Sequence, residues 1–171
     1  KEAPEKLASC GKVTRSIKVA SLDDDDKQVP LGEAGEICAR GVLVSHSYFE
    51  KPEETAEVRK FGWHHTGDVG KFDEDGYLYI VDRKKDMILV SGFNVYPNEV
   101  EGVVAQHPGV VEVAAVAQAD EHSGEVVALF VVRKDPALTP EAVIAFARIE
   151  LTGYKVPRHV YFRSELPKTN V

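Results

Sequence analysis

The sequence predicts an α+β fold in which a mainly antiparallel β-rich subdomain is followed by a small α+β domain. The first part carries short runs of β-branched and aromatic residues with polar alternation, which is typical of half-buried antiparallel strands. The second part alternates apolar runs of strand length with two amphipathic helical patterns. This change lies near Lys85, so we expect one unit over residues 1–84 and a second over residues 85–171.

Composition and charge describe a folded, acidic chain. Of its 171 residues, 43% are hydrophobic and 29% are charged, which is ordinary for a globular protein. A formal net charge of −7 argues against nucleic-acid binding, which needs a basic face to release counterions from phosphates. Cys10 and Cys38 have no His or Cys near them at metal-ligand spacing, so we expect reduced, packed thiols and no metal site. No apolar run approaches 18 residues, and the first residues lack a signal-peptide pattern.

Four strands and one short helix are expected in the first part. Pro52 suits a first helical position and predicts a helix from Glu53 to Lys60. Asp73-Glu-Asp-Gly76 predicts a turn because glycine tolerates positive φ. The expected strands are Val13–Leu22, Gly35–Gly41, Trp63–Phe72 and Tyr77–Val81.

An acidic block precedes the second of these strands. Asp23 to Asp26, followed by Lys27, repels itself and favours a solvated hairpin tip. A calcium loop is disfavoured because the ligand spacing and turn glycine of an EF-hand are missing.

Two helices and three strands are expected in the second part. Val100 and Val104 share one helical face within Pro97–Gln106. Thr139 predicts the amino-terminal cap of a helix that extends to Leu151. The expected strands are Val110–Ala117, Glu125–Arg133 and His159–Arg163, and the second is nearly continuous in apolar residues, which indicates burial on both faces.

The strongest functional signal comes from Thr66-Gly67-Asp68 and from Asp82-Arg-Lys-Lys-Asp-Met-Ile-Leu-Val-Ser-Gly-Phe-Asn-Val-Tyr-Pro-Asn-Glu-Val-Glu101. A glycine allows close backbone approach to a ligand, and a carboxylate can accept hydrogen bonds from both hydroxyls of a ribose. Taken alone, Asp68 is better explained by a solvated turn and Arg83 by a surface salt bridge.

In this order and spacing, the two segments resemble the junction between the domains of acyl-adenylate-forming enzymes, the AMP-dependent synthetases and ligases. They are most similar to bacterial long-chain fatty acyl-CoA ligases. The resemblance implies that Asp68 and Arg83 contact the ribose of ATP and of the acyl-adenylate. It also implies that residues 1–84 end a large AMP-binding domain, and that residues 85–171 form a mobile carboxy-terminal domain.

The resemblance assigns three further roles. Lys85 takes the position of the hinge about which the small domain turns. Ser91, Gly92 and Phe93 take the position of a loop that lines the channel for the pantetheine arm of coenzyme A, although a simple β-turn glycine is an alternative for Gly92. Leu166-Pro-Lys-Thr-Asn-Val171 resembles the start of the motif that carries the catalytic lysine, which we therefore expect beyond Val171 and not at Lys168.

The reaction implied for the parent enzyme activates a fatty acid with ATP to acyl-AMP and pyrophosphate, and then transfers the acyl group to coenzyme A. Its Mg ligand is expected upstream of this chain, and the 171 residues alone are expected to be inactive. The resemblance further implies a cytoplasmic parent, with peripheral association at the inner membrane face and a homodimer as additional expectations.

Two alternatives stay open. One is an adenylating ligase for medium-chain or aryl acids, because the acyl tunnel would be built upstream. The other is a non-catalytic module that binds coenzyme A or a partner protein. His64 and His65 have no nucleophile or carboxylate at motif spacing, so a structural role beside Trp63 is expected for them.

Overall fold

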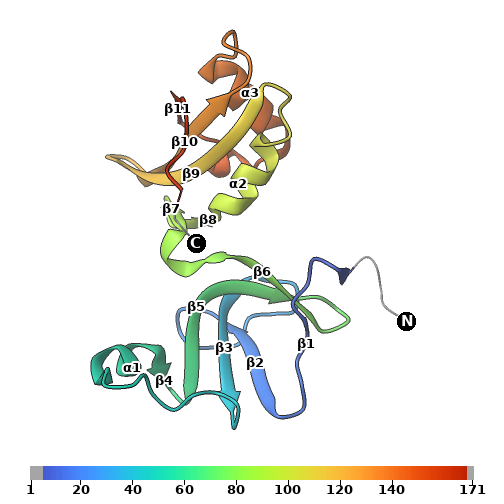
Figure 1. Cartoon of the computed structure of the whole chain (residues 1–171), viewed down its shortest axis with the longest axis vertical. Coiled ribbons are helices and arrows are strands. Elements are labelled where there is room, and N and C mark those ends of the chain that lie inside the picture. The colour runs from blue at the N-terminus through green and yellow to red at the C-terminus, as the bar shows by residue number, and fades with distance from the viewer. Residues whose placement is uncertain (1–5, 169–171) are drawn as a thin grey trace. The chain divides into compact units, whose positions relative to one another are not determined.

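The computed structural model describes residues 6–168, and its contacts divide the chain into two compact units, Lys1–Lys85 and Asp86–Val171 (Figure 1). The division therefore lies between Lys85 and Asp86, where the sequence pattern changes. Antiparallel strands dominate the first unit, and the second combines a sheet with two α-helices, so the predicted α+β class is confirmed.

The first unit is an antiparallel sheet in the order β1-β6-β5-β3-β2, with β4 paired to β5. Two predicted strands have their predicted bounds, while β2 begins later than expected and β6 extends to Arg83. The strands are β1 (Gly11–Lys12), β2 (Ile17–Leu22), β3 (Gly35–Gly41), β4 (Arg59–Lys60), β5 (Trp63–Phe72) and β6 (Tyr77–Arg83).

The helix of the first unit, α1, spans Pro52–Val58 and is shorter than predicted. Arg59 and Lys60 instead form β4, which pairs with His64 and Trp63 of β5. Because α1 has no buried residue, another helical turn would gain no packing energy. Pairing Arg59 and Lys60 with the sheet satisfies their backbone hydrogen-bonding groups instead.

A small apolar core supports the sheet of the first unit. Ala20, Leu22 and Cys38 are buried, and Trp63 packs against them. Both thiols are free, but only Cys38 is packed; Cys10 is exposed, so the prediction that both thiols are packed is wrong for Cys10. The predicted turn at Asp73–Gly76 is present, with the Gly76 N–H donating to the Asp73 carbonyl at 3.0 Å.

The second unit contains a five-stranded sheet in the order β11-β10-β7-β8, with β9 also paired to β10. Among the described strands of this sheet, β10 and β11 are the one parallel pair. The elements are β7 (Ile88–Val90), β8 (Phe93–Val95), α2 (Pro97–Val104), β9 (Val110–Asp120), β10 (Gly124–Arg133), α3 (Pro140–Glu150) and β11 (His159–Arg163), together with the 3-10 turns η2 (Lys84–Asp86) and η3 (Gly153–Lys155).

Strand β10 lies at the centre of the core of the second unit. Four successive residues, Val126 to Leu129, are buried, which confirms that this strand is covered on both faces. Val100 of α2 and Val143 of α3 belong to the same buried cluster as Leu129, so both helices pack on the sheet (Figure 1). Thr139 caps α3 as predicted, since its side chain accepts a hydrogen bond from the Ala142 N–H at 3.3 Å.

Between residues 6 and 168, no helix is both long enough and apolar enough to cross a membrane.

Candidate functional site: a bulge in strand β5

The candidate site is built on a mismatch between β3 and β5. Cys38 pairs with His65 and Glu36 pairs with Val69, so β5 advances four positions while β3 advances two. Three residues of β5, Thr66 to Asp68, thus lie opposite the single residue Ile37 of β3 and leave the regular ladder with that strand. Gly67 turns the chain there with φ of 75°, a conformation that other residues adopt at a cost. Bulges of this kind re-aim side chains beside functional sites.

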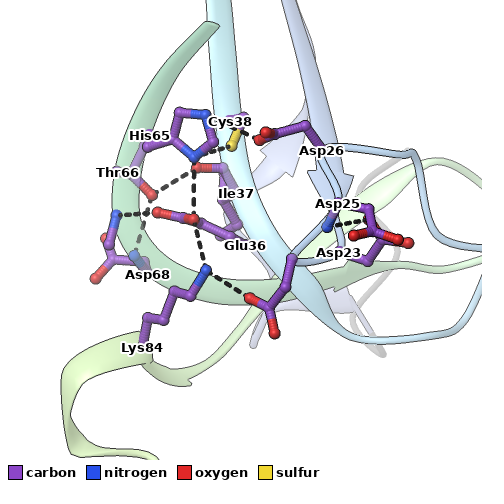
Figure 2. A network of polar contacts seen from close by, with 12 residues as sticks. Asp23, Asp25, Asp26, Glu36, Ile37, Cys38, His65, Thr66, Asp68 and Lys84 are labelled. Atoms are coloured by element: carbon purple, nitrogen blue, oxygen red, sulfur yellow. Dashed lines mark hydrogen bonds and ion pairs between the residues drawn. The ribbon is translucent and has the colours of Figure 1, made fainter. Parts of the chain in front are cut away.

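Side chains from both strands hold the bulge in place (Figure 2). The Thr66 hydroxyl donates to the carbonyl of Ile37 at 2.7 Å and accepts from the Asp68 N–H at 3.1 Å. The Gly67 N–H donates to Glu36 Oε1 at 3.2 Å. The backbone groups that the bulge removes from the ladder are therefore partly satisfied by side chains.

The structure brings the two predicted ribose-binding residues together. Asp68 and Arg83 are cross-strand partners on β5 and β6, and Arg83 Nε lies 3.4 Å from Asp68 Oδ1. Their side chains are 35% and 65% exposed, so this ion pair contributes little to stability and leaves the carboxylate reachable. Contact with a ribose stays a prediction.

Glu36 has three hydrogen-bonding partners beside the bulge, and no sequence motif pointed to it. Its carboxylate is 10% exposed and also contacts His65 Nδ1 at 3.0 Å and Lys84 Nζ at 3.1 Å, both through Oε2. Burial alone would raise the pKa of Glu36, but hydrogen bonds from His65 and Lys84 outweigh burial and hold that pKa below its usual value. Glu36 is therefore ionised at neutral pH.

Lys84 joins this carboxylate to the acidic block. Its ammonium also lies 2.9 Å from Asp24 Oδ1. Burial lowers the pKa of Lys84, yet the hydrogen bonds and charges of Asp24 and Glu36 hold it above its usual value. The block forms the predicted surface turn, but it is not uniformly solvated: Asp24 is 84% exposed, whereas Asp26 is 23% exposed and faces His65.

His65 has partners that its position in the sequence did not reveal. Because an ionised carboxylate can only accept, Nδ1 donates to Glu36; the same atom lies 3.4 Å from Cys38 Sγ. Nε2 lies 3.3 Å from Asp26 Oδ1, outside hydrogen-bonding geometry. Glu36 and Asp26 thus reach His65 from other segments, although no carboxylate stands at motif spacing from it in the sequence.

Glu36, Cys38 and His65 bring three potential metal-ligand atoms within 4.8 Å of one another, a group that the sequence spacing did not predict. Two features favour a hydrogen-bond network instead. The Lys84 ammonium already supplies a positive charge at the Glu36 carboxylate. Burial, with the nearby charges of Glu36 and Asp26, raises the pKa of the Cys38 thiol to about 12, which keeps it protonated at neutral pH.

Lys85, the predicted hinge, is exposed and lies at the centre of the 3-10 turn η2. The two units divide directly after it. Short 3-10 turns are common connectors, and domain rotation is usually absorbed by a few connecting residues, so its position is compatible with that role, which stays a prediction.

The Ser91-Gly92 loop joins β7 to β8 in a two-residue hairpin. Ser91 has φ of 50° and Gly92 has φ of 85°, the two positive values that a type I′ turn requires. A Cβ on Gly92 would meet nothing within 4 Å, so turn geometry explains this glycine and supports the alternative given for it. Phe93 is 56% exposed and stacks on Tyr154 with ring centroids 4.8 Å apart. A role of Ser91, Gly92 and Phe93 in a coenzyme A channel stays a prediction.

Lys168 pairs with Glu112 at 2.7 Å. The rest of the predicted lysine motif, from Thr169 to Val171, lies outside the described residues, as does the lysine expected after it.

The sequence matches a known protein family and several named ligases. Residues 99–171 match the model of the AMP-binding enzyme C-terminal domain. The chain is 60% identical over 163 residues to a long-chain-fatty-acid–CoA ligase of Salmonella typhimurium and 58% identical to one of Escherichia coli. Each alignment covers 95% of this chain and 29% of the relative, so the chain spans less than a third of the relatives it matches.

Solved structures agree with this result. MatB from Rhodopseudomonas palustris with bound ATP superposes with a TM-score of 0.86 at 34% identity, over 95% of this chain and 33% of that chain. The o-succinylbenzoate CoA synthetase of Bacillus subtilis, in complex with its acyl-adenylate, superposes with a TM-score of 0.84 at 33% identity, over 96% of this chain and 34% of that chain.

Residues 99–171 belong to the AMP-binding enzymes as their C-terminal domain. Over 95% of its length, the chain is similar to the long-chain-fatty-acid–CoA ligases.

Proposed function

We propose that this chain is part of a long-chain fatty acid–CoA ligase. The full-length protein activates a fatty acid with ATP to acyl-AMP and pyrophosphate, and then transfers the acyl group to the thiol of coenzyme A. The observation that carries this proposal is the bulge that presents Asp68 beside Arg83, in a chain 60% identical to such a ligase over 95% of its length.

Asp68 is proposed to accept hydrogen bonds from the two ribose hydroxyls of the nucleotide. An ionised carboxylate has two acceptor oxygens, and each hydroxyl is a donor. Arg83, as its cross-strand partner, orients the carboxylate and contributes a second polar contact to the ribose. Neither residue takes part in bond making; both hold the nucleotide so that its α-phosphate meets the carboxylate of the acid.

The second unit is proposed to be the mobile domain of the enzyme, and the first unit the end of its large AMP-binding domain. Rotation about a few residues is the usual means by which a domain changes pose. Lys85, exposed in a 3-10 turn at the division between the units, is the proposed hinge. Ser91, Gly92 and Phe93 would then line the path of the pantetheine arm in the pose used for thioester formation.

Adenylation brings two anions together, so cationic groups and Mg must offset the developing charge. Among residues 6–168, the one group of three potential metal ligands includes the thiol of Cys38, whereas Mg prefers oxygen ligands. This group therefore does not fit Mg, and we place the Mg ligand, like the catalytic lysine, in other segments of the full-length protein.

For a lipid substrate, we further propose a cytoplasmic protein that contacts the inner membrane face and forms a homodimer.

Other acids are the main alternative within the class. A similar protein of Mycobacterium tuberculosis is named a medium/long-chain-fatty-acid–CoA ligase, and one of the similar solved structures is an o-succinylbenzoate CoA synthetase. A non-catalytic module that binds coenzyme A or a protein is the alternative from another class.

Pyrophosphate release by the full-length protein tests the proposal directly. With ATP, coenzyme A and a panel of acids from acetate through palmitate to coumarate, we expect the highest kcat/KM for long acyl chains. A maximum at short or aryl acids would retain the mechanism and reject the fatty-acid substrate. No release with any acid would favour the non-catalytic module.

Replacing Asp68 tests the ribose contact. Asp68→Ala removes one or two charge-assisted hydrogen bonds, so we expect kcat/KM for ATP to fall by the equivalent of roughly 2 to 4 kcal/mol. Asp25→Ala is the matched control, because Asp25 is an exposed carboxylate of the same unit, in the turn after β2, and its ion pair is with Lys27. Unchanged kcat/KM for ATP in Asp68→Ala would reject the assignment.

Replacing Lys85 tests the hinge. Lys85→Pro fixes φ at that position, so it should retain the half-reaction that matches the fixed pose and block the other. Lys85→Ala leaves the backbone free and should retain both. The two half-reactions are measured separately, as pyrophosphate exchange and as transfer from preformed acyl-AMP to coenzyme A. Equal loss of both in Lys85→Pro would contradict the hinge.

A further inference from the structure

The carboxylate of Glu36 connects the bulge that carries the proposed ribose site with the segment that carries the proposed hinge. The Glu36 carboxylate accepts hydrogen bonds from the N–H of Gly67, in the middle of the bulge, and from the ammonium of Lys84, the residue between Arg83 and Lys85 (Figure 2). All of these residues belong to the first unit. The proposed ribose site and the residue before the proposed hinge therefore share one hydrogen-bonding partner.

Burial makes these bonds difficult to exchange for others. The Glu36 side chain is 10% exposed, and a charge so far removed from water is stable only if its oxygens are well paired. Oε1 is paired with Gly67, and Oε2 with His65 and Lys84. The carboxylate therefore favours a single arrangement of these partners over alternatives in which one of them moves away.

The shape of the bulge depends on that arrangement. Gly67 is followed directly by Asp68, whose N–H is held by Thr66. Without an acceptor at Glu36, the Gly67 N–H loses its partner, and the glycine, with no Cβ to restrict it, can adopt other conformations. Such a change would turn the Asp68 carboxylate away from its position beside Arg83.

A second ion pair on the same acidic turn shows the contrast. Lys27 pairs with Asp25 at 3.3 Å, but both side chains are about three-quarters exposed, at 74% and 76%. Lys84 is 38% exposed and bridges two carboxylates, one of them nearly buried. Exposed pairs contribute little, so Lys84 and not Lys27 is the cation that restrains this region.

We propose that Glu36 is a positioning residue for adenylation: with Lys84, it fixes the Thr66–Asp68 bulge so that Asp68 faces the ribose of ATP. This inference rests on the proposed function, because it requires that Asp68 contact the nucleotide. It assigns Glu36 no contact with substrate.

The test is a double-mutant cycle in the full-length protein, read out as KM for ATP and kcat in pyrophosphate exchange. Glu36→Gln keeps the shape of the side chain but removes its charge and replaces one acceptor oxygen by an amide donor. Either Gly67, or His65 and Lys84, then lose their acceptor, so we expect KM for ATP to rise about tenfold with kcat changed less than about threefold. Because Glu36 acts through Asp68, adding Glu36→Gln to Asp68→Ala should raise KM by less than about threefold more.

Lys84 supplies a second route that does not depend on a change at a buried position. Lys84→Met should raise KM for ATP by about the same factor as Glu36→Gln. Lys84→Arg retains the charge and should have the KM of the unsubstituted protein. Lys27→Met is the matched control and should leave KM unchanged, since it removes the exposed pair on the same turn. Thermal unfolding of each variant identifies any that fails to fold.

The outcomes separate the two proposals. If Asp68→Ala raises KM but Glu36→Gln and Lys84→Met do not, the positioning role is rejected and the ribose contact stands. If Glu36→Gln raises KM by the same factor with and without Asp68, its effect is general and the positioning role is also rejected. If Asp68→Ala leaves KM unchanged, the ribose contact fails, and the positioning role fails with it.

Discussion

The register of β3 against β5 constrains the rest of the first unit. Between the paired positions, β5 has two residues more than β3, so Thr66 to Asp68 cannot remain in the ladder with β3. The N–H groups of Gly67 and Asp68 therefore donate to side chains, that of Gly67 to Glu36 and that of Asp68 to Thr66. The carboxylate of Glu36 needs a cation in turn, and Lys84 provides it from the end of the sheet. The position of the accessible Asp68 therefore depends on a network of hydrogen bonds that includes the nearly buried carboxylate of Glu36.

The two units are stabilised in different ways. The second has a continuous apolar core around β10, covered by α2 and α3, which suits a body that moves as one piece. The apolar core of the first is small, and polar contacts hold its functional edge. Apolar packing has no preferred direction, whereas hydrogen bonds fix orientation, so the polar network is the part of this unit suited to orient Asp68, the carboxylate proposed to face the nucleotide.

Strand and helix positions follow well from periodicity in this chain, as Gly35–Gly41 and the Thr139 cap show. Patterns fail where local and tertiary preferences compete: Arg59 and Lys60 continue a helical pattern but pair with β5. The Asp68–Arg83 contact is recoverable because both residues lie in motifs. Glu36 is not, since its three partners lie far along the chain, His65 and Gly67 on β5 and Lys84 in η2, and a single glutamate at a strand start carries no signal.

The central claim is that the bulge presents Asp68 to the ribose of an adenylate. A crystal structure of the full-length protein with a non-hydrolysable acyl-adenylate analogue tests it most directly. We predict both ribose hydroxyls within hydrogen-bonding distance of the Asp68 carboxylate, with Glu36 still bound to the Gly67 N–H and Lys84. An analogue whose ribose lies elsewhere, with Asp68 contacting only Arg83, would contradict the account.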